Sequence, residues 1–275
     1  MKIILKNTKS ISEQLKVNLF LKPALKILKS RRTNFWVMPH DTICREIFLK
    51  GFYEKGLLEA MLLTTPGRYA ALDIGANIGN HSVFLSPHFD EVLSFEPSSS
   101  NFNHLISNLE LNQISNITPF NFGLSEKSGT ARMSNQADPK NTNDSISLTG
   151  GHGPQVEIQK GDSVDEIRNL KNISFIKIDV EGHEPEVIIG LKETIQHHMP
   201  QIFWEAFEFN EAKKSMDLLS DIGYKYFYHI HRKPIKKGLL GFLIRPFRSE
   251  SIFIEALQEN TSLTGMNVAS SIKLT

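Results

Sequence analysis

Short apolar runs alternate with helical patterns of hydrophobic residues along most of the chain after residue 67. The runs are nearly continuous, which is typical of strands buried on both faces of a parallel sheet. They predict strands over 69–73, 91–95, 117–122, 173–178 and 202–207, and the helical periodicity predicts helices over 79–85, 101–111, 184–197 and 211–222. Strand and helix in regular alternation indicate an α/β domain with helices on both faces of the sheet.

The pattern changes near the end of the chain and within two polar segments. Residues 224–230 and 251–256 have the composition of two further strands, and we expect them to form an antiparallel pair at a sheet edge. Residues 134–153 are rich in small polar residues, which is typical of a long loop that is either a functional lid or an insertion. Residues 231–248 carry six lysines and arginines around an apolar run, so this loop is either a solvated basic loop or a clamp for an anionic substrate or lipid head group.

Composition adds limits to this picture. With 275 residues, 40% hydrophobic and 22% charged, the chain is typical of a globular protein and unlike disordered or disulfide-stapled classes. Its one cysteine, Cys44, cannot form an internal disulfide, so we expect a small hydrophobic side chain in a reducing compartment. No apolar run approaches the roughly 20 residues that cross a bilayer, and we expect a cytoplasmic protein.

Charge is distributed unevenly although the formal net charge is only +1. Residues 1–34 carry nine lysines and arginines against one acid, a net charge of +8, which leaves −7 for the remainder. Hydrophobic residues form a loose helical stripe in this segment, interrupted by Pro23. Such a basic amphipathic arm either docks on its own domain or a partner, or lies on an anionic membrane surface. The overall balance gives no reason to expect a nucleic-acid partner.

The glycine-containing segment 72–80 lies between a predicted strand and a predicted helix. Glycines in that position allow a tight turn, and the following helix presents unpaired N–H groups to a ligand. The spacing is Gly-x-Asn-x-Gly rather than Gly-x-Gly-x-x-Gly, and Asp73 ends the strand just before it. A carboxylate there would repel a diphosphate and suits a positively charged ligand, so S-adenosylmethionine fits better than a dinucleotide.

Glu96 ends the next predicted strand, 21 residues after Gly75. At about that separation an acid at the end of the second strand reaches the hydroxyls of a ribose. Both S-adenosylmethionine and NAD contain this ribose, so Glu96 alone does not separate the two ligands. The pair of Asp73 and Glu96 on consecutive strand ends is the more specific signal.

Four motifs in fixed order carry a family resemblance. They are Asp73-Ile-Gly-Ala-Asn-Ile-Gly79, Phe95-Glu-Pro97, the helix through Asn108-Leu-Glu-Leu-Asn112, and Ile178-Asp-Val-Glu-Gly-His-Glu184. In order and spacing they resemble the FkbM-type S-adenosylmethionine-dependent methyltransferases, from about residue 51 to 208. The resemblance implies a class I methyltransferase fold, a Rossmann-like three-layer α/β sandwich whose mostly parallel sheet has seven strands, the last of them antiparallel.

The same resemblance implies which residues bind the cofactor. Asp73, Gly75, Asn77, Gly79 and Glu96 are expected to line the S-adenosylmethionine site. Two further residues extend it, with Glu54 expected at the methionine end and Asn121 on the adenine side. We therefore expect a methyltransferase domain over 51–260, preceded by a basic helical extension over 1–50 and followed by a tail over 261–275.

The motif after the strand 173–178 supplies the candidate catalytic residues Asp179, Glu181 and His183. If the extended conformation continues, these side chains alternate and project to one side. In one mechanism His183 or Asp179 removes the proton of an acceptor hydroxyl. In the alternative, Asp179 and Glu181 bind a divalent cation with His183 or Glu205 as a further ligand, and carboxylate ligands favour Mg²⁺. We favour the mechanism without a metal.

The expected activity is therefore O-methylation of a hydroxyl on a sugar, glycan or secondary metabolite, and the acceptor class rests on the family resemblance alone. Two other functions remain as alternatives. One is an NAD-dependent oxidoreductase on a Rossmann domain, which the glycine spacing and Asp73 disfavour. The other is a membrane-peripheral binding protein that uses the basic segment 1–34.

Overall fold

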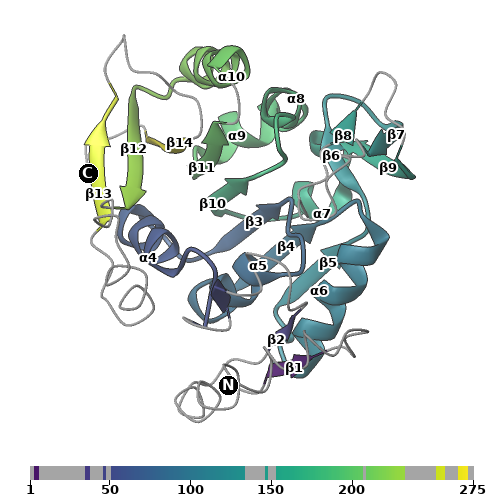
Figure 1. The fold of residues 1–275 in the computed structure, drawn as a ribbon. Coiled ribbons are helices and arrows are strands. Elements are labelled where there is room, and N and C mark those ends of the chain that lie inside the picture. The colour runs from purple at the N-terminus through teal and green to yellow at the C-terminus, as the bar shows by residue number, and fades with distance from the viewer. Residues whose placement is uncertain are drawn as a thin grey trace.

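The fold centres on a mostly parallel sheet, shown in the computed structural model of the chain (Figure 1). The structure describes residues 3–5, 35–37, 46–47, 51–133, 146–147, 153–206, 209–232, 252–257 and 266–271. Within them the sheet has eight strands in the order β13-β12-β14-β11-β10-β3-β4-β5. The strands are β3 (Ala70–Ile74), β4 (Glu91–Phe95), β5 (Ile117–Phe120), β10 (Ile173–Ile178), β11 (Gln201–Ala206), β12 (Tyr226–Arg232), β13 (Ile252–Ala256) and β14 (Met266–Ser271).

Strands β11, β10, β3, β4 and β5 pair in parallel, as the apolar runs predict. β12 and β13 form the expected antiparallel pair, and β13 lies at the edge of the sheet. β14 pairs antiparallel with both β11 and β12 and so occupies the place between them. The expected α/β fold with an antiparallel strand is thereby confirmed.

Two expectations for the end of the chain were wrong. The sheet has eight strands rather than seven, and residues 266–271, which we expected in a tail, form β14 in its interior. Two side chains of β14 are fully buried, Val268 and Ser270, and Trp204 Nε1 donates a hydrogen bond of 3.1 Å to Ser270 Oγ. The segment carries small polar residues inside a sheet, so hydrophobic periodicity could not reveal it.

Helices cover both faces of the sheet (Figure 1). One face packs against α4 (Lys55–Thr64), α5 (Asn80–Leu85) and α6 (Ser99–Leu111), and the other against α7 (Asp165–Arg168), α8 (Glu184–Gly190), α9 (Lys192–His198) and α10 (Phe209–Ile222). Ala71 and Leu72 belong to opposite hydrophobic clusters, as alternation along a strand requires. The single helix expected over 184–197 is two helices, because the chain turns at Leu191 between α8 and α9.

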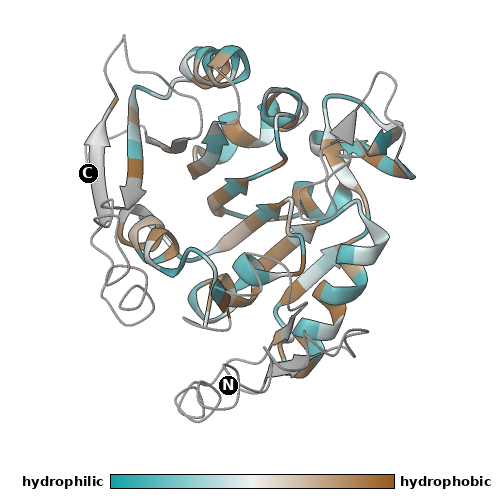
Figure 2. Ribbon diagram, in the orientation of Figure 1, coloured by the Kyte–Doolittle hydropathy of each residue, from teal (hydrophilic) through white to brown (hydrophobic). Residues whose placement is uncertain are grey.

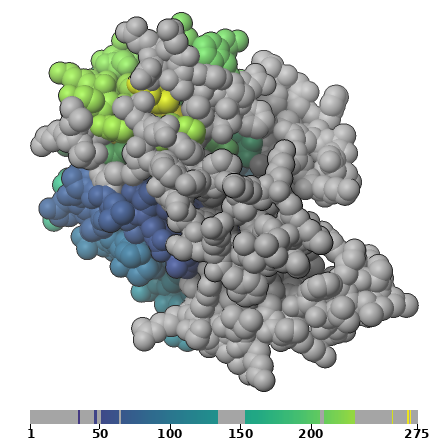
Figure 3. Space-filling view, turned by 60° about the vertical axis from the view of Figure 1, so that its left-hand side comes forward, coloured from purple at the N-terminus to yellow at the C-terminus, as the bar shows by residue number. Residues whose placement is uncertain are grey.

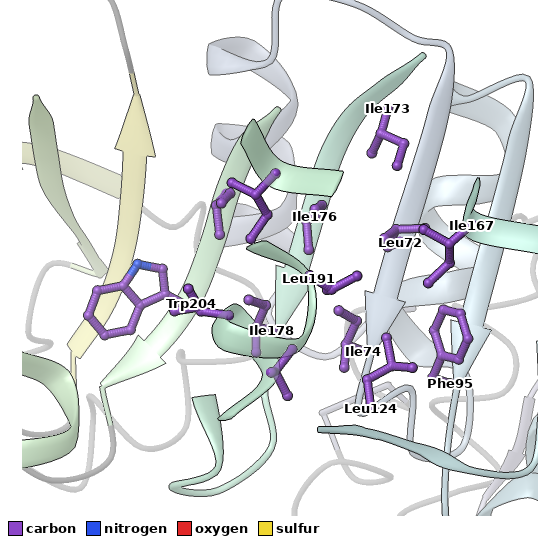
Figure 4. Packing of buried hydrophobic residues seen from close by; sticks show 14 of the residues in the cluster. Leu72, Ile74, Phe95, Leu124, Ile167, Ile173, Ile176, Ile178, Leu191 and Trp204 are labelled. Atoms are coloured by element: carbon purple, nitrogen blue, oxygen red, sulfur yellow. The ribbon is translucent and has the colours of Figure 1, made fainter. Parts of the chain in front are cut away.

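The core between the sheet and α8 is built from large apolar side chains of consecutive strands. Figure 4 shows Leu72, Ile74, Ile176 and Ile178 side by side with Leu191, and all five are at most 1% exposed. Colouring by hydropathy shows brown segments along the strands and teal on the outer faces of the helices (Figure 2). Burial of this apolar surface holds the strand ends in fixed positions, from which the candidate site is built.

On the opposite face, α4 lies against β12, and the space-filling view shows the blue residues of α4 beneath the green residues of that part of the sheet (Figure 3). Leu57, Leu58 and Met61 of α4 and Ile230 of β12 share one hydrophobic cluster. Helix α4 thereby fixes the chain that leads into it, including Glu54, near the sheet.

A second, smaller sheet has the order β6-β9-β7-β8. Its strands are β6 (Gly123–Ser125), β7 (Gly129–Met133), β8 (Ile146–Ser147) and β9 (Gln155–Lys160). β8 lies within the segment 134–153 that we expected to be a loop, of which the structure otherwise describes only Gly153. β6 contacts α8, which places the small sheet beside the end of β10.

Most of the expected N-terminal extension lies outside the described residues, as do Cys44 and all but the first two residues of the loop 231–248. β1 (Ile3–Leu5) pairs in parallel with β2 (Phe35–Val37), so residues 3–5 are extended and the helix expected there was wrong. Phe35 is fully buried against Phe52. In the described part of the chain, every helix is too short or too polar to cross a membrane.

Candidate active site

The loop after β3 makes a tight turn in which three residues have positive φ angles. These angles are +76° at Gly75, +51° at Asn77 and +85° at Gly79, a left-handed conformation that glycine and asparagine tolerate best. A Cβ atom on Gly75 would lie 1.9 Å from the carbonyl oxygen of Asp179. The loop therefore packs directly on the end of β10, and glycine is required at its first position.

Glu96 lies at the end of β4 beside this loop and is 5% exposed. Its Oε2 accepts a hydrogen bond from the backbone N–H of Asn77 and its Oε1 one from Ser98, both of 2.8 Å. Burial raises the pKa of Glu96 to about 7, although these two N–H groups favour the ionised form. Each oxygen of a carboxylate has a further lone pair, so Glu96 can still accept hydrogen bonds from a ligand.

Asn121 lies just after β5 and holds the turn that follows Glu96. Its side-chain amide donates to the carbonyl oxygens of Glu96 at 2.9 Å and Pro97 at 3.3 Å. The hydroxyl of Ser99 donates to the side-chain oxygen of Asn121 at 3.0 Å. The structure thus places Asn121 beside Glu96, while its role toward adenine stays a prediction.

Glu54 is held near the site because the backbone of its neighbour Tyr53 is hydrogen-bonded to Asn80 at the start of α5. The side chain of Asn80 accepts a hydrogen bond of 2.9 Å from the backbone N–H of Tyr53 and donates one of 3.1 Å to its carbonyl oxygen. The Glu54 carboxylate lies 4.0 Å from Nε2 of His81. Burial lowers the pKa of His81 to about 4, and the charge of Lys177 acts in the same direction.

Asp73 is fully buried in a polar row that crosses the sheet beneath the glycine loop. Its register partners are Ser94 on β4 and Lys177 on β10, so the three side chains share one face. The Ser82 hydroxyl donates to Asp73 Oδ2 at 2.5 Å, and the Ser94 hydroxyl donates to Ser82 Oγ at 2.9 Å. Asp73 is therefore held inside the protein, and its expected contact with a positively charged ligand stays a prediction.

Lys177 was not recognised from the sequence, although it interrupts the apolar run of β10. Its ammonium lies 3.2 Å from Asp73 Oδ1, 3.3 Å from Asp179 Oδ2 and 2.9 Å from the carbonyl oxygen of Gly75. Burial alone would lower the pKa of Lys177, but the two carboxylates outweigh it and raise the pKa above its ordinary value. Buried lysines are rare unless paired, so a lysine inside an apolar strand was the available signal.

Three carboxylates of the predicted catalytic and metal sets come together at the ends of β10 and β11. Oxygen atoms of Asp179, Glu181 and Glu205 lie within 4.8 Å of one another. Burial and the neighbouring charge of Asp179 raise the pKa of Glu181 to about 7 and that of Glu205 to about 8. Although burial disfavours its charge, Lys177 holds the pKa of Asp179 below the ordinary range. Near neutral pH the cluster thus combines an ionised Asp179 with two neighbours that retain protons readily.

His183 lies elsewhere, and the expected alternation of Asp179, Glu181 and His183 was wrong. Glu181 and Gly182 have φ angles of +54° and +100°, which end the extended conformation. His183 is 5% exposed, its Nε2 is 3.0 Å from Ser125 Oγ and its Nδ1 is 3.6 Å from Glu186 Oε2. It joins α8 to the small sheet.

Glu184 fixes the turn that separates these groups. Its Oε1 lies 3.2 Å from the backbone nitrogens of Val180 and of Gly182, both of which donate to it. Glu184 is the first residue of α8, where a carboxylate also interacts favourably with the helix dipole. The residues of this motif therefore have different roles. Glu184 shapes the turn, and Asp179 and Glu181 lie near Glu205 at the end of β11. His183 packs against the small sheet.

Comparison with known proteins identifies the family to which the chain is similar. Residues 73–226 match the family described as methyltransferase FkbM domain. Hexuronic acid methyltransferase AglP of Haloferax volcanii is 26% identical over 182 residues, which cover 66% of this chain and 74% of the relative. Methyltransferase 1 of Beauveria bassiana is 25% identical over 175 residues, which cover 56% of this chain and 68% of the relative.

Among solved structures, the FkbM methyltransferase of Methylobacillus flagellatus KT matches with a TM-score of 0.43 and 18% identity. The match covers 74% of this chain and 45% of that structure, so the chain spans less than half of its length.

Proposed function

The chain belongs to the methyltransferase FkbM family, and from this premise we propose that it transfers the methyl group of S-adenosylmethionine to a hydroxyl oxygen of a sugar or glycan. A relative named for its action on hexuronic acid supports the sugar class. A secondary metabolite with an equivalent hydroxyl is the other acceptor that this chemistry allows. The buried Glu96 beside the glycine loop is the observation that carries the proposal, because it offers acceptor oxygens to a pair of hydroxyls.

The residues around the loop fit S-adenosylmethionine. Glu96 is the partner for the ribose hydroxyls, and Asn121 lies beside it for the adenine side. Gly75, Asn77 and Gly79 form the turn on which the cofactor would rest, and Glu54 carries negative charge for its methionine ammonium. When bound, the cofactor supplies an electrophilic methyl group.

Asp179 is the residue we assign to the acceptor. The positive charge of Lys177 lowers the pKa of Asp179 and so keeps its carboxylate ionised. The side chain of Asp179 is 29% exposed, so it can reach a bound hydroxyl. In this role it accepts the hydroxyl proton as the oxygen attacks the methyl carbon. Much of the rate comes from positioning the acceptor oxygen in line with the S–CH3 bond of the cofactor, which breaks as the methyl group is transferred. The turn shaped by Glu184 fixes Asp179 for that purpose.

A divalent cation held by Asp179, Glu181 and Glu205 is the second candidate mechanism, favoured by the closeness of their oxygens. Three carboxylate oxygens suit Mg²⁺, which would lower the pKa of the acceptor hydroxyl. Binding would require Glu181 and Glu205 to release protons that burial makes them retain near neutral pH. We therefore favour direct proton transfer to Asp179.

Calorimetry with S-adenosylhomocysteine tests the cofactor assignment. We expect binding by the unaltered protein, a loss of at least tenfold in affinity for Glu96→Ala, and an unchanged affinity for Glu110→Ala, which alters an exposed acid on α6. If the unaltered protein binds NADH instead, it is an oxidoreductase and the proposal is wrong.

An assay that measures release of S-adenosylhomocysteine during turnover tests both the class of the acceptor and the need for a metal ion. A panel should pair hexuronic acids with the corresponding neutral sugars and with phenolic metabolites. We expect turnover with a sugar that EDTA does not abolish and that Asp179→Asn reduces by at least a hundredfold. Turnover that requires added Mg²⁺ would favour the second mechanism, and turnover confined to phenols would contradict the sugar class.

A further inference from the structure

The proposed chemistry uses Lys177 only as the cation that keeps Asp179 ionised, and this leaves its other two partners unexplained. Lys177 lies inside β10 with its side chain 2% exposed, so it can neither meet an acceptor nor exchange freely with solvent. Its ammonium nevertheless faces three groups from three parts of the site: the carbonyl oxygen of Gly75 in the loop, Asp73 at the end of β3, and Asp179 after β10. The ammonium donates a hydrogen bond to the Gly75 carbonyl oxygen and forms ion pairs with the two carboxylates.

The partners of Lys177 cannot easily be satisfied by water. Asp73 is 0% exposed, and a buried carboxylate that loses its cation is costly. The Gly75 carbonyl belongs to a loop that already packs on the Asp179 backbone too closely for a side chain. The lysine therefore ties the loop to both carboxylates at Gly75, where the loop packs on the Asp179 backbone.

We propose that Lys177 is a positioning residue of the cofactor site, which fixes the glycine loop against Asp73 and Asp179 through its bond to the Gly75 carbonyl oxygen. The inference rests on the proposed function, because it takes the loop as the surface that binds S-adenosylmethionine. It differs from a purely structural role, since the lysine sets the conformation of a binding loop and not only the stability of the sheet.

Lys177→Met tests this role because methionine has a similar length and no donor or charge. Calorimetry with S-adenosylhomocysteine should show affinity at least tenfold lower than that of the unaltered protein. Ile195→Ala is the matched control, since Ile195 is fully buried in α9 on the other face of the sheet. It should lower the melting temperature and leave the affinity within twofold of that of the unaltered protein.

A second readout needs no ligand. In backbone NMR spectra of the free protein, the amide signals of Gly75, Ala76 and Asn77 should move in Lys177→Met and stay in place in Ile195→Ala. If Lys177→Met does not fold, Lys177→Met combined with Asp179→Asn removes one of the uncompensated carboxylates. Its affinity should then be at least tenfold below that of Asp179→Asn alone.

The outcomes separate this inference from the proposed function. No binding by the unaltered protein would overturn both. Binding by the unaltered protein together with an affinity of Lys177→Met within threefold of it would overturn the role of Lys177 alone. An equal loss of affinity in Ile195→Ala would also overturn it, because the effect would then follow general stability.

Discussion

The backbone N–H of Asn77 donates a hydrogen bond of 2.8 Å to Glu96, so the glycine loop and the end of the neighbouring strand form one unit. This bond aligns the loop with a carboxylate that is buried and whose pKa is raised to about 7. The charge of Glu96 therefore changes near neutral pH, and we expect this change to alter ligand binding.

Affinity for S-adenosylhomocysteine should rise with pH through about 7. Ribose hydroxyls that donate to Glu96 favour its ionised form, whereas below the raised pKa the free protein must release a proton to bind. We expect binding about tenfold weaker at pH 6 than at pH 8, measured by calorimetry. Glu96→Gln should bind more weakly at pH 8 and lose this dependence, and a slope that persists in Glu96→Gln would assign it to another group.

Replacing Gly75 with alanine should destabilise the protein more than a glycine replacement elsewhere. The new Cβ would overlap the Asp179 carbonyl, in addition to the strain of a positive φ. We expect a loss of roughly 3 kcal/mol or more in the free energy of unfolding. Gly129→Ala is the control, since Gly129 also has a positive φ, of +156°, but a Cβ there meets no atom within 4 Å, and it should cost roughly 1 to 2 kcal/mol. Equal effects in urea unfolding would contradict the packing described here.

His81 should make the protein sensitive to acid. Its pKa is about 4 in the folded state against an ordinary 6.5, so the unfolded chain binds more protons between these values. The contribution of neutral His81 to the free energy of unfolding is fully present above about pH 6.5. It is lost as pH falls toward 4, by about 3 kcal/mol in total. His81→Gln should therefore lose less stability than the unaltered protein between pH 7 and pH 4.5 in urea unfolding. Parallel losses in both proteins would exclude His81 as the source.

Removing the Ser270 hydroxyl should destabilise the sheet through β14. The indole N–H of Trp204 would lose its acceptor in a fully buried place. An unsatisfied buried donor costs roughly 1 to 3 kcal/mol, which we expect for Ser270→Ala in chemical unfolding. Ser220→Ala, on the exposed side of α10, should stay within about 0.5 kcal/mol of the unaltered protein. A similar result for both would argue against β14 as an interior strand.

The sequence predicted the parallel part of the fold well because most residues of its strands are apolar. β3, β4, β10 and β11 lie within one residue of the predicted ranges, and the positions of Asp73 and Glu96 followed from those strand ends. β14 could not be predicted in this way. Its interior place depends on pairing with β11 and β12, and Trp204 and Ser270, which are hydrogen-bonded across that pair, lie 66 residues apart.

For the candidate catalytic residues too, sequence patterns predicted some positions and not others. Glu205 was correctly expected near Asp179 and Glu181, because parallel strands end at the same edge of a sheet. The position of His183 depends on two positive φ angles at Glu181 and Gly182, which no periodic pattern encodes. Lys177 needed the register of β3 and β10 before its partners could be named.

The interior place of β14 also constrains the order in which the sheet assembles. β12 and β13 precede β14 in the chain, yet the described sheet joins them to β11 only through β14. The pair of β12 and β13 therefore cannot join β11 in this order until residues 266–271 have taken their place between β11 and β12. The exposed edge of β11 is the surface at risk of wrong pairing in that interval.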